Sequence, residues 1–189
     1  MSALAQVRAE PTGLPGVLVI RPVVSTDPRG NFVETYNERT MGATLGAAVT
    51  FVQDNHARSK RGVVRGLHYQ LPPHAQGKLV RVAHGSVYDV AVDVRRSSPN
   101  FGCWNAMLLN AIDFVQIWIP PGFAHGYLAL EDDTDVVYKV TDHYAPEYER
   151  SIAWDDPALG IDWPALGSTA LLSPKDAAAP RLADADTFQ

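Results

Sequence analysis

Cysteine is almost absent from this sequence, which contains Cys103 alone among 189 residues. A single cysteine excludes an intramolecular disulfide and is typical of proteins in reducing compartments. Long apolar runs are missing too, since none approaches the roughly 20 residues that a membrane-spanning helix needs. Residues 1–15 also lack the apolar segment of a secretory signal. These absences predict a cytoplasmic protein that does not bind membranes.

Basic residues are fewer than acidic ones, with 16 Lys and Arg against 21 Asp and Glu and a net charge of −5. This balance argues against a broad surface for nucleic acid, but it permits a local cationic pocket for a phosphorylated small molecule. The apolar content of 46% is ordinary for a globular protein, and the length suits one core. We expect one domain over residues 1–189, with a barrel core at 16–142 and a wrapping C-terminal segment at 143–189.

Short β-rich segments separated by turn residues fill most of the chain. They are rich in Val, Ile, Phe, Tyr and Trp and are bounded by Gly, Pro, Asn or Asp, which is typical of strands. We expect strands at 16–21, 49–56, 62–70, 78–83, 86–94, 103–109, 113–119, 124–130 and 135–141. Only 37–45 predicts a helix within this region, and the tail from about 159 predicts loops with a short helix. The pattern indicates an all-β jelly-roll barrel of the cupin type with short peripheral helices.

The segment from Val87 to Val94 alternates strictly between two sets of residues. Such a period of two predicts a strand with one buried face. The simplest interpretation of Asp89 and Asp93 is a solvated or turn-capping face, because carboxylates are seldom buried.

The segment 65–70, RGLHYQ, looks like a metal-binding barrel signature whose metal ligands have been replaced. Cupin barrels commonly carry G-x5-H-x-H-x3-4-E-x6-G, in which two His and one Glu bind a divalent metal. Here Gln70 stands at the second His, and Lys78, followed by six residues and then Gly85, stands at the Glu. A protonated lysine has no lone pair to offer a metal and brings its own positive charge. The sequence therefore predicts a site in which a lysine, and not a metal ion, supplies the positive charge.

Residues 120–125 fit the second half of the same signature, P-x-G-x-x-H, which ends at His125. A lone His in a strand is more often a core or rim residue, but His68 and His125 occupy both halves of one signature. We expect them side by side at the barrel mouth. Arg65 could be a surface ion-pair partner, but it lies in an apolar strand where an unpaired guanidinium would be costly. We therefore expect Arg65 to bind an anion.

Six separated motifs, in order along the chain, resemble those of the dTDP-4-dehydrorhamnose 3,5-epimerase family. They are DPRGNFVETY (27–36), FVQDNHARSKRGVVRGLHYQ (51–70), QGKLVRVAHGSVYDVAVDVRRSSPNFG (76–102), IPPGFAHGYLAL (119–130), VVYKVTDHYAPEYERSIAWDDPALGIDWP (136–164) and LSPKD (172–176). The resemblance implies a homodimeric cupin jelly roll that uses no metal and no cofactor. It implies epimerisation at C3 and C5 of dTDP-4-keto-6-deoxy-D-glucose, giving dTDP-4-keto-L-rhamnose, in dTDP-L-rhamnose or related deoxysugar biosynthesis.

The resemblance also implies roles for individual residues. His68 would be the proton-abstracting base, held by the carboxylate of Asp176. Tyr138 would donate a proton from the opposite face, and Lys78 would contact the sugar. The implied substrate-binding residues are Arg29, Phe32, Glu34, Gln53, Asn55, Arg65, His125, Tyr144, Glu149 and Lys175. Among these, Tyr144 would stack on thymine, and exchange of N-terminal strands between subunits would let Arg29 and Glu34 act across the dimer interface.

These residue types suit the implied chemistry. Both epimerised carbons flank the C4 ketone, so removal of either proton gives an enolate. A neutral imidazole is a suitable base near neutral pH, and a carboxylate such as Asp176 can fix its tautomer. Lys78 can stabilise the oxyanion, and inversion needs an acid such as Tyr138 on the other face of the ring. Arginines match the oxygens of a diphosphate.

Three other interpretations remain open from the sequence. A monofunctional 3- or 5-epimerase of an antibiotic deoxysugar pathway would keep the same motifs. A metal-dependent cupin enzyme is disfavoured by Gln70 and Lys78. A non-catalytic sugar-nucleotide binding module would have no use for a His–Asp pair facing a tyrosine. Tyr138 taken alone is equally a cross-strand core aromatic, and Tyr144 taken alone a loop-packing residue.

Overall fold

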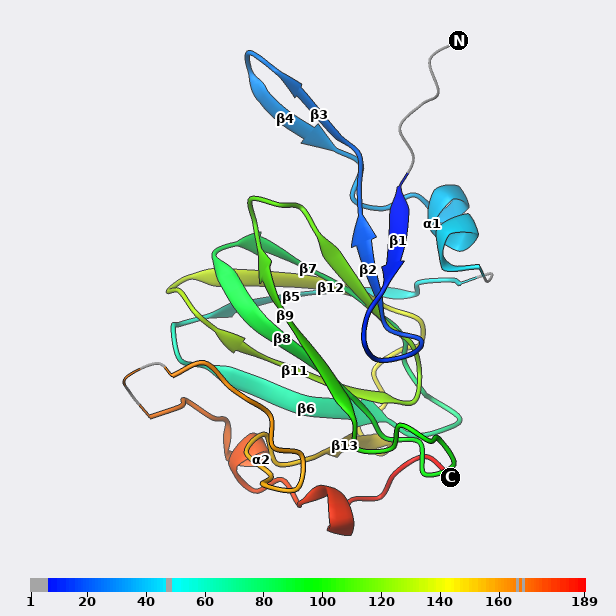
Figure 1. The fold of residues 1–189 in the computed structure, drawn as a ribbon, viewed down its shortest axis with the longest axis vertical. Helices are drawn as coiled ribbons and strands as arrows, with labels where there is room; N and C mark the ends of the chain where they lie inside the picture. Colours follow the sequence, from blue (N-terminus) through cyan, green and yellow to red (C-terminus); the bar gives the residue numbers. More distant parts are fainter. Residues whose placement is uncertain (1–6, 47–48, 166, 168) are drawn as a thin grey trace.

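A computed structural model describes residues 7–46, 49–165, 167 and 169–189 of the chain. Two antiparallel β-sheets face each other, and a two-stranded hairpin extends from one end (Figure 1). The predicted all-β, cupin-like sandwich is confirmed. Within the described ranges, no helix is long and apolar enough to cross a membrane.

The first sheet has six strands, and its spatial order differs from the chain order. The order is β1 (Arg8–Pro11), β2 (Leu18–Arg21), β10 (Gln116–Ile119), β7 (Lys78–His84), β12 (Thr134–Val140) and β5 (Gln53–Ser59). The second sheet has the order β13 (Glu149–Ser151), β6 (Val64–Gln70), β11 (Phe123–Ala129), β8 (Ser86–Asp93) and β9 (Trp104–Asn110). The hairpin consists of β3 (Val24–Asp27) and β4 (Gly30–Val33).

The helical segments are short and lie outside the sandwich. They are α1 (Glu38–Leu45), α2 (Pro174–Ala177) and a 3-10 turn (Leu182–Asp184). The helix predicted at 37–45 is confirmed, because Asn37 is its N-cap and accepts a hydrogen bond from the amide of Arg39. The short helix predicted in the tail is α2.

The central strands were predicted with small errors at their ends, and one error is larger. The strand predicted at 49–56 begins only at Gln53 and continues to Ser59. Residues 49–52 instead lie over the outer face of the first sheet, where Phe51 packs edge-on against Trp118. The prediction missed β1, β3, β4 and β13, which are short and, unlike the equally short β2 and β10, have few apolar residues.

Apolar side chains form three layers instead of one barrel interior. The central layer lies between the sheets and includes Phe123 and Ile117. The outer face of the second sheet is covered by the C-terminal segment, where Leu182 packs with Val92. The outer face of the first sheet is covered by α1, through Met41. Both faces of each sheet are therefore partly buried.

This layering explains why the interpretation of Asp89 and Asp93 as a solvated face was wrong. Both residues are 0% exposed, and they lie on the same face of β8 as Ala91, which packs in the central layer. Asp93 does cap a turn, because it accepts a hydrogen bond from the amide of Arg95, and it also binds that guanidinium. The alternation on β8 marks two different buried faces.

A β-bulge interrupts the pairing of β6 with β11. His125 pairs with His68, but Tyr127 pairs with Arg65, so that three steps on β6 match two on β11. The extra residue brings Arg65 to the same face of the sheet as His68. Gly66 lies within the bulge with a φ of +132°, and a Cβ there would stand 2.4 Å from the Cα of Gly126.

We predict that Gly66→Ala lowers the free energy of unfolding by more than about 2 kcal/mol, because it adds both a backbone clash and strain. Urea unfolding would measure the change. Gly13→Ala is the matched control, since a Cβ at that position has nothing within 4 Å, and it should stay within about 0.5 kcal/mol of the parent. Equal stability of the two variants would contradict this account of the bulge.

Candidate functional site

Two adjoining cavities are lined by residues of both sheets. The first lobe, of about 280 Å³, is lined by Gln53, Asn55, His68, Tyr69, Gln70, Gln76, Lys78, Tyr138, Tyr144 and Glu149. The second lobe, of about 250 Å³, is lined by Ala57, Arg65, His68, Lys78, His125, Tyr127, Tyr138, Ser173 and Asp176. His68, Lys78 and Tyr138 line both lobes, so three of the four residues with predicted catalytic roles lie where the two cavities meet; the fourth, Asp176, lines the second lobe alone.

The first sheet contributes side chains through its period of two. Asn55 on β5 pairs with Tyr138 on β12, and Val140 pairs with both Gln53 and Lys78. Paired residues project to the same side of a sheet, and so do residues two apart on one strand. Gln53, Asn55, Tyr138 and Lys78 therefore share the inner face.

The second sheet places His68 and His125 directly opposite each other on β6 and β11. The prediction that they lie side by side is confirmed. The buried His125 bonds through Nε2 to the Oδ2 of Asp89 at 2.8 Å. This pairing was not predicted, because the alternation on 87–94 indicated a solvated or turn-capping face for Asp89.

Asp176 reaches His68 from the C-terminal segment. The Oδ1 of Asp176 lies 2.5 Å from the Nε2 of His68. Ser173 caps α2, because its hydroxyl accepts from the amide of Asp176 and donates to Oδ2. Burial is the largest single influence on Asp176 and raises its pKa, but the hydrogen bond and charge of His68, the hydrogen bond of Ser173 and the charge of Lys175 together hold that pKa below its usual value. The S-x-x-D spacing was a capping signal that could have identified Ser173.

Lys78 is a buried cation in the wall of both lobes. The residue is 8% exposed, and its Nζ donates to the backbone carbonyl of His68 at 3.1 Å. Burial lowers the pKa of Lys78 to about 8, although the carboxylates of Glu149 and Asp89 act in the opposite direction. The ammonium form therefore predominates at neutral pH, without a carboxylate in direct contact.

Tyr138 faces the second sheet from the first. Its half-buried position raises the pKa of the phenol, although the charge of Arg65 lowers it in part. The phenol therefore stays protonated at neutral pH and can act as a donor. His68 and Tyr138 belong to different sheets, so they stand on opposite walls of the site.

Tyr144, Glu149 and Lys175 form a chain of contacts at the first lobe. The hydroxyl of Tyr144 donates to Glu149 at 2.7 Å, and Lys175 forms an ion pair with the other carboxylate oxygen at 2.5 Å. Burial is the largest single influence on Glu149 and raises its pKa, but Lys175, Tyr144 and the charge of His68 together lower the pKa by more, so that the carboxylate is charged. The ring of Tyr144 is 55% exposed and therefore accessible to a ligand.

Arg65 has two hydrogen-bond acceptors within the protein. Its Nε donates to the hydroxyl of Ser59 at 3.1 Å, and its Nη2 donates to the carbonyl of Arg58. The guanidinium is not buried among apolar side chains. The bulge turns Arg65 toward the second lobe, where its guanidinium lies at the exposed side.

Three predicted residues lie away from both lobes within one chain. Arg29 and Phe32 belong to the β3–β4 hairpin, which extends away from the sandwich in Figure 1, and Glu34 follows it directly. Arg29 pairs with Asp27 at 2.5 Å, and Phe32 is 74% exposed. These residues do not join the site in a single protomer.

The position of a cupin metal ligand is occupied by Gln70, which turns its amide toward the backbone of two loops. Across the described part of the chain, no three His, Cys, Asp or Glu side chains gather as a metal-binding group. Gln70 and Gln76 line the first lobe, and the sequence analysis assigned neither to substrate.

Comparison with known proteins places this arrangement in a family. The family model described as dTDP-4-dehydrorhamnose 3,5-epimerase matches residues 11–184. The chain belongs to this epimerase family. The enzyme of that name from Pseudomonas aeruginosa is 52% identical over 181 residues, which cover 96% of this chain and 99% of the relative.

Solved structures of the epimerase family have the same fold. The Legionella pneumophila dTDP-6-deoxy-D-glucose-3,5-epimerase, in complex with dTDP-4-keto-L-rhamnose, is 47% identical with a TM-score of 0.92, covering 96% of this chain and 95% of that one. A 4-keto-6-deoxy sugar epimerase from the novobiocin gene cluster of Streptomyces spheroides is 37% identical with a TM-score of 0.89, covering 95% and 89%. The family therefore includes an enzyme from an antibiotic gene cluster.

The burial of Lys78 leads to a prediction about stability. Below about pH 8 this lysine is charged in both states, and burial disfavours the charged folded form. Between about pH 8 and 10.5 the unfolded chain binds more protons, so wild-type stability rises with pH. We predict that Lys78→Met raises the free energy of unfolding by about 1–3 kcal/mol at pH 7 and by less at pH 9.5.

Urea unfolding at the two pH values would measure this difference. Lys60→Met, at an exposed position, should change stability by less than about 0.5 kcal/mol at both pH values. A Lys78→Met protein that is less stable than the parent at pH 7 would show that the buried charge is compensated by its contacts.

Proposed function

We propose that this protein is a dTDP-4-dehydrorhamnose 3,5-epimerase. It converts dTDP-4-keto-6-deoxy-D-glucose to dTDP-4-keto-L-rhamnose in dTDP-L-rhamnose or related deoxysugar biosynthesis. The observation that carries this proposal is the position of a His–Asp pair and a protonated tyrosine on opposite walls of one cavity, with a buried lysine between the two lobes.

His68 is the base in this mechanism. Asp176 binds Nε2, so it fixes the tautomer and stabilises the imidazolium that forms when the other ring nitrogen takes a proton from C3 or C5. The electron pair of the broken C–H bond moves into the ring and onto the C4 oxygen, which gives an enolate. General-base catalysis of this kind contributes about 10²–10⁴-fold.

Lys78 stabilises the enolate oxygen, and Tyr138 completes the inversion. A fixed ammonium group in a water-poor cavity stabilises a developing oxyanion without reorganisation. The phenol of Tyr138 then protonates the same carbon from the face opposite His68, and the enolate collapses to the ketone. Because one base and one acid serve two carbons, the sugar ring must shift between the two steps.

Several other polar residues in or beside the two lobes bind the nucleotide, the diphosphate and the sugar. Tyr144 is the platform for thymine, and Arg65 and Lys175 provide cations for phosphate oxygens. Gln53, Asn55, His125 and Glu149 contribute hydrogen-bonding groups around the sugar and base. Binding energy from the nucleotide can then be used to orient the sugar at His68.

A homodimer would bring the remaining predicted residues into use. The β3–β4 hairpin carries the exposed Phe32 and the cation Arg29 beyond the sandwich, where they have no ligand to contact in one protomer. Exchange of this N-terminal segment between subunits would place Arg29, Phe32 and Glu34 over the partner's first lobe. Each site would then be composed of two chains.

A monofunctional epimerase of an antibiotic deoxysugar pathway is the second candidate. The similarity to a 3'-monoepimerase from Streptomyces bikiniensis, 36% identical with a TM-score of 0.86 and covering 92% of this chain, favours it. Its acid and base would act at one carbon instead of two. The number of carbons that exchange protons with solvent distinguishes the two functions.

We predict that incubation with dTDP-4-keto-6-deoxy-D-glucose in deuterated water incorporates deuterium at both C3 and C5, because each proton is removed to a base that equilibrates with solvent. NMR and mass spectrometry of the sugar would measure the incorporation. Exchange at one carbon would establish the monofunctional enzyme, and exchange at neither would refute the proposed function.

His68→Ala tests the base in the same assay. It should reduce exchange at both carbons by at least about 10³-fold while dTDP still binds, since the nucleotide contacts lie elsewhere. The exposed His84 serves as a matched control, because His84→Ala removes a histidine remote from both lobes. Wild-type exchange in His68→Ala would refute the assignment of the base.

We predict that Arg29→Ala and His68→Ala restore activity to each other when the two variant proteins are mixed, unfolded and refolded together. A mixed dimer with exchanged hairpins has one complete site, composed of Arg29 from one chain and His68 from the other. Random assembly would make half of the dimers mixed, and about a quarter of the wild-type activity would return.

Refolding each variant alone is the control and should restore nothing. If the mixture is no more active than the sum of the separate variants, the hairpin does not act across a dimer interface.

A further inference from the structure

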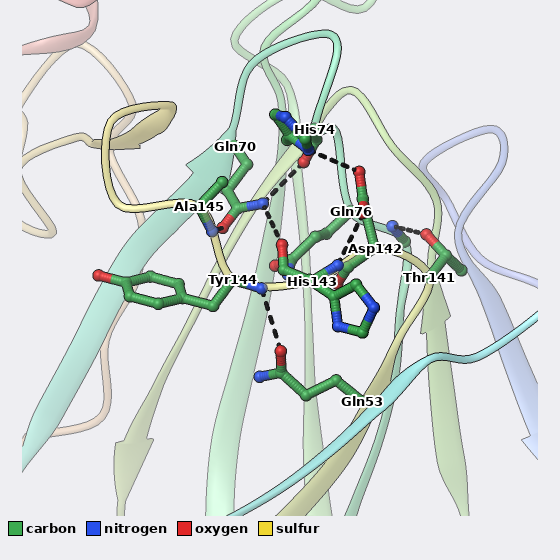
Figure 2. A network of polar contacts seen from close by, with 10 residues as sticks. Gln53, Gln70, His74, Gln76, Thr141, Asp142, His143, Tyr144 and Ala145 are labelled. Atoms are coloured by element: carbon green, nitrogen blue, oxygen red, sulfur yellow. Dashed lines mark hydrogen bonds and ion pairs between the residues drawn. The ribbon is translucent and has the colours of Figure 1, made fainter.

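Gln70 is a buried polar residue with no role in the proposed mechanism. It is 3% exposed and is the last residue of β6, two residues after the proposed base His68. A buried amide that lacks partners is costly, so its contacts show what it stabilises. These contacts are all with the backbone of two loops (Figure 2).

The contacts of Gln70 flank Tyr144 on both sides. Its Nε2 donates to the carbonyl of His143 at 3.2 Å, and its Oε1 accepts from the amide of Ala145 at 2.9 Å. These are the residues directly before and after Tyr144. The orientation of the tyrosine is therefore tied to the side chain of Gln70.

The amide of Tyr144 is held from the other sheet. It donates to the Oε1 of Gln53 on β5 at 3.0 Å, whereas Gln70 lies on β6 in the second sheet. Three consecutive residues of the loop are thus bound by two glutamines that project from facing sheets (Figure 2). A loop with its backbone fixed at three points has little freedom to move its central side chain.

The second loop attached to Gln70 supports the first. Nε2 of Gln70 also donates to the carbonyl of His74 at 2.7 Å, and the ring of His74 contacts Asp142 at 3.1 Å. Gln76 donates to the carbonyl of Asp142 at 2.8 Å. The loops that follow β6 and β12 therefore form one connected polar network around Gln70 (Figure 2).

We propose that Gln70 is a positioning residue for nucleotide binding: by fixing the backbone on both sides of Tyr144, it preorganises the aromatic platform of the first lobe. This inference rests on the proposed role of Tyr144 as the thymine platform. Gln70 acts through Tyr144 rather than on the reacting carbons, so its loss weakens affinity for the nucleotide more than it slows the chemical step.

Gln70→Met tests this role, because methionine keeps the length of the side chain and adds no charge near Lys78. Stacking of a base on an aromatic side chain is worth roughly 5- to 150-fold in affinity. We expect Gln70→Met to weaken dTDP binding by about tenfold and to raise KM similarly, with kcat within about threefold of wild type. Calorimetry and steady-state kinetics would measure these values.

A double-mutant cycle separates positioning from general destabilisation. In a Tyr144→Ala background, Gln70→Met should weaken dTDP binding by less than about twofold further, because there is no longer a platform to position. Equal tenfold effects in both backgrounds would overturn the proposal. So would a Gln70→Met protein with wild-type affinity.

Thr134→Val is the matched control. It also removes a buried donor to a backbone carbonyl, that of Glu131 at 2.9 Å, but at the other end of β12. We expect lower thermal stability with unchanged affinity for dTDP. If Thr134→Val weakens dTDP binding as much as Gln70→Met does, the effect is one of stability and the proposal fails.

Amide hydrogen exchange of the wild-type protein tests, without a variant or a ligand, whether Gln53 and Gln70 fix the backbone around Tyr144. The amides of Tyr144 and Ala145 should exchange at least about 100-fold more slowly than in an open loop, since both donate to glutamine side chains. Unprotected amides would overturn the proposal even if Gln70→Met does not fold. Protected amides in a protein that does not bind dTDP would instead refute the proposed function. The contacts of Gln53 and Gln70 with the loop would then have a structural role only.

Discussion

The hydrogen bond between His68 and Asp176 is the interaction on which the rest of the site depends. It joins residues 108 positions apart in the chain and therefore exists only when the C-terminal segment packs on the second sheet. Leu182 and its neighbours cover the outer face of that sheet, and the same segment brings α2 to the cavity. Packing on one side of the sheet thus determines the chemistry available on the other.

The two facing sheets divide the proposed chemistry between them. The proposed base lies on β6 and the proposed acid on β12, so a sugar ring bound between the sheets would meet one on each side. Lys78 is buried in the same space, where burial lowers its pKa and costs stability. A cavity that excludes water strengthens the effect of that charge on an enolate, so the property that destabilises the fold favours the reaction.

A strand could be predicted where its own residues identify it, and not where it forms only by pairing with another strand. Long central strands such as β8 and β12 were predictable because their seven or eight residues are rich in Val and Tyr and are bounded by turn residues. The short strands β1, β3, β4 and β13 were missed because they depend on their partners rather than on their own pattern. Asp89 was misplaced because alternation cannot distinguish a solvated face from a second buried one. The orientation of Arg65 depends on a bulge, which is a property of two strands together.

The sequence by itself determined the all-β architecture, most of the central strands and the family motifs that contain His68, Lys78, Tyr138 and Asp176. These features depend on residue type and on a period of two, which are local. Only the tertiary structure decided that His125 pairs with Asp89, that Gln70 and Gln53 bind one loop from opposite sheets, and that the β3–β4 hairpin lies away from the site. Contacts between distant segments are selected by packing and burial of the whole chain, and no local pattern encodes them.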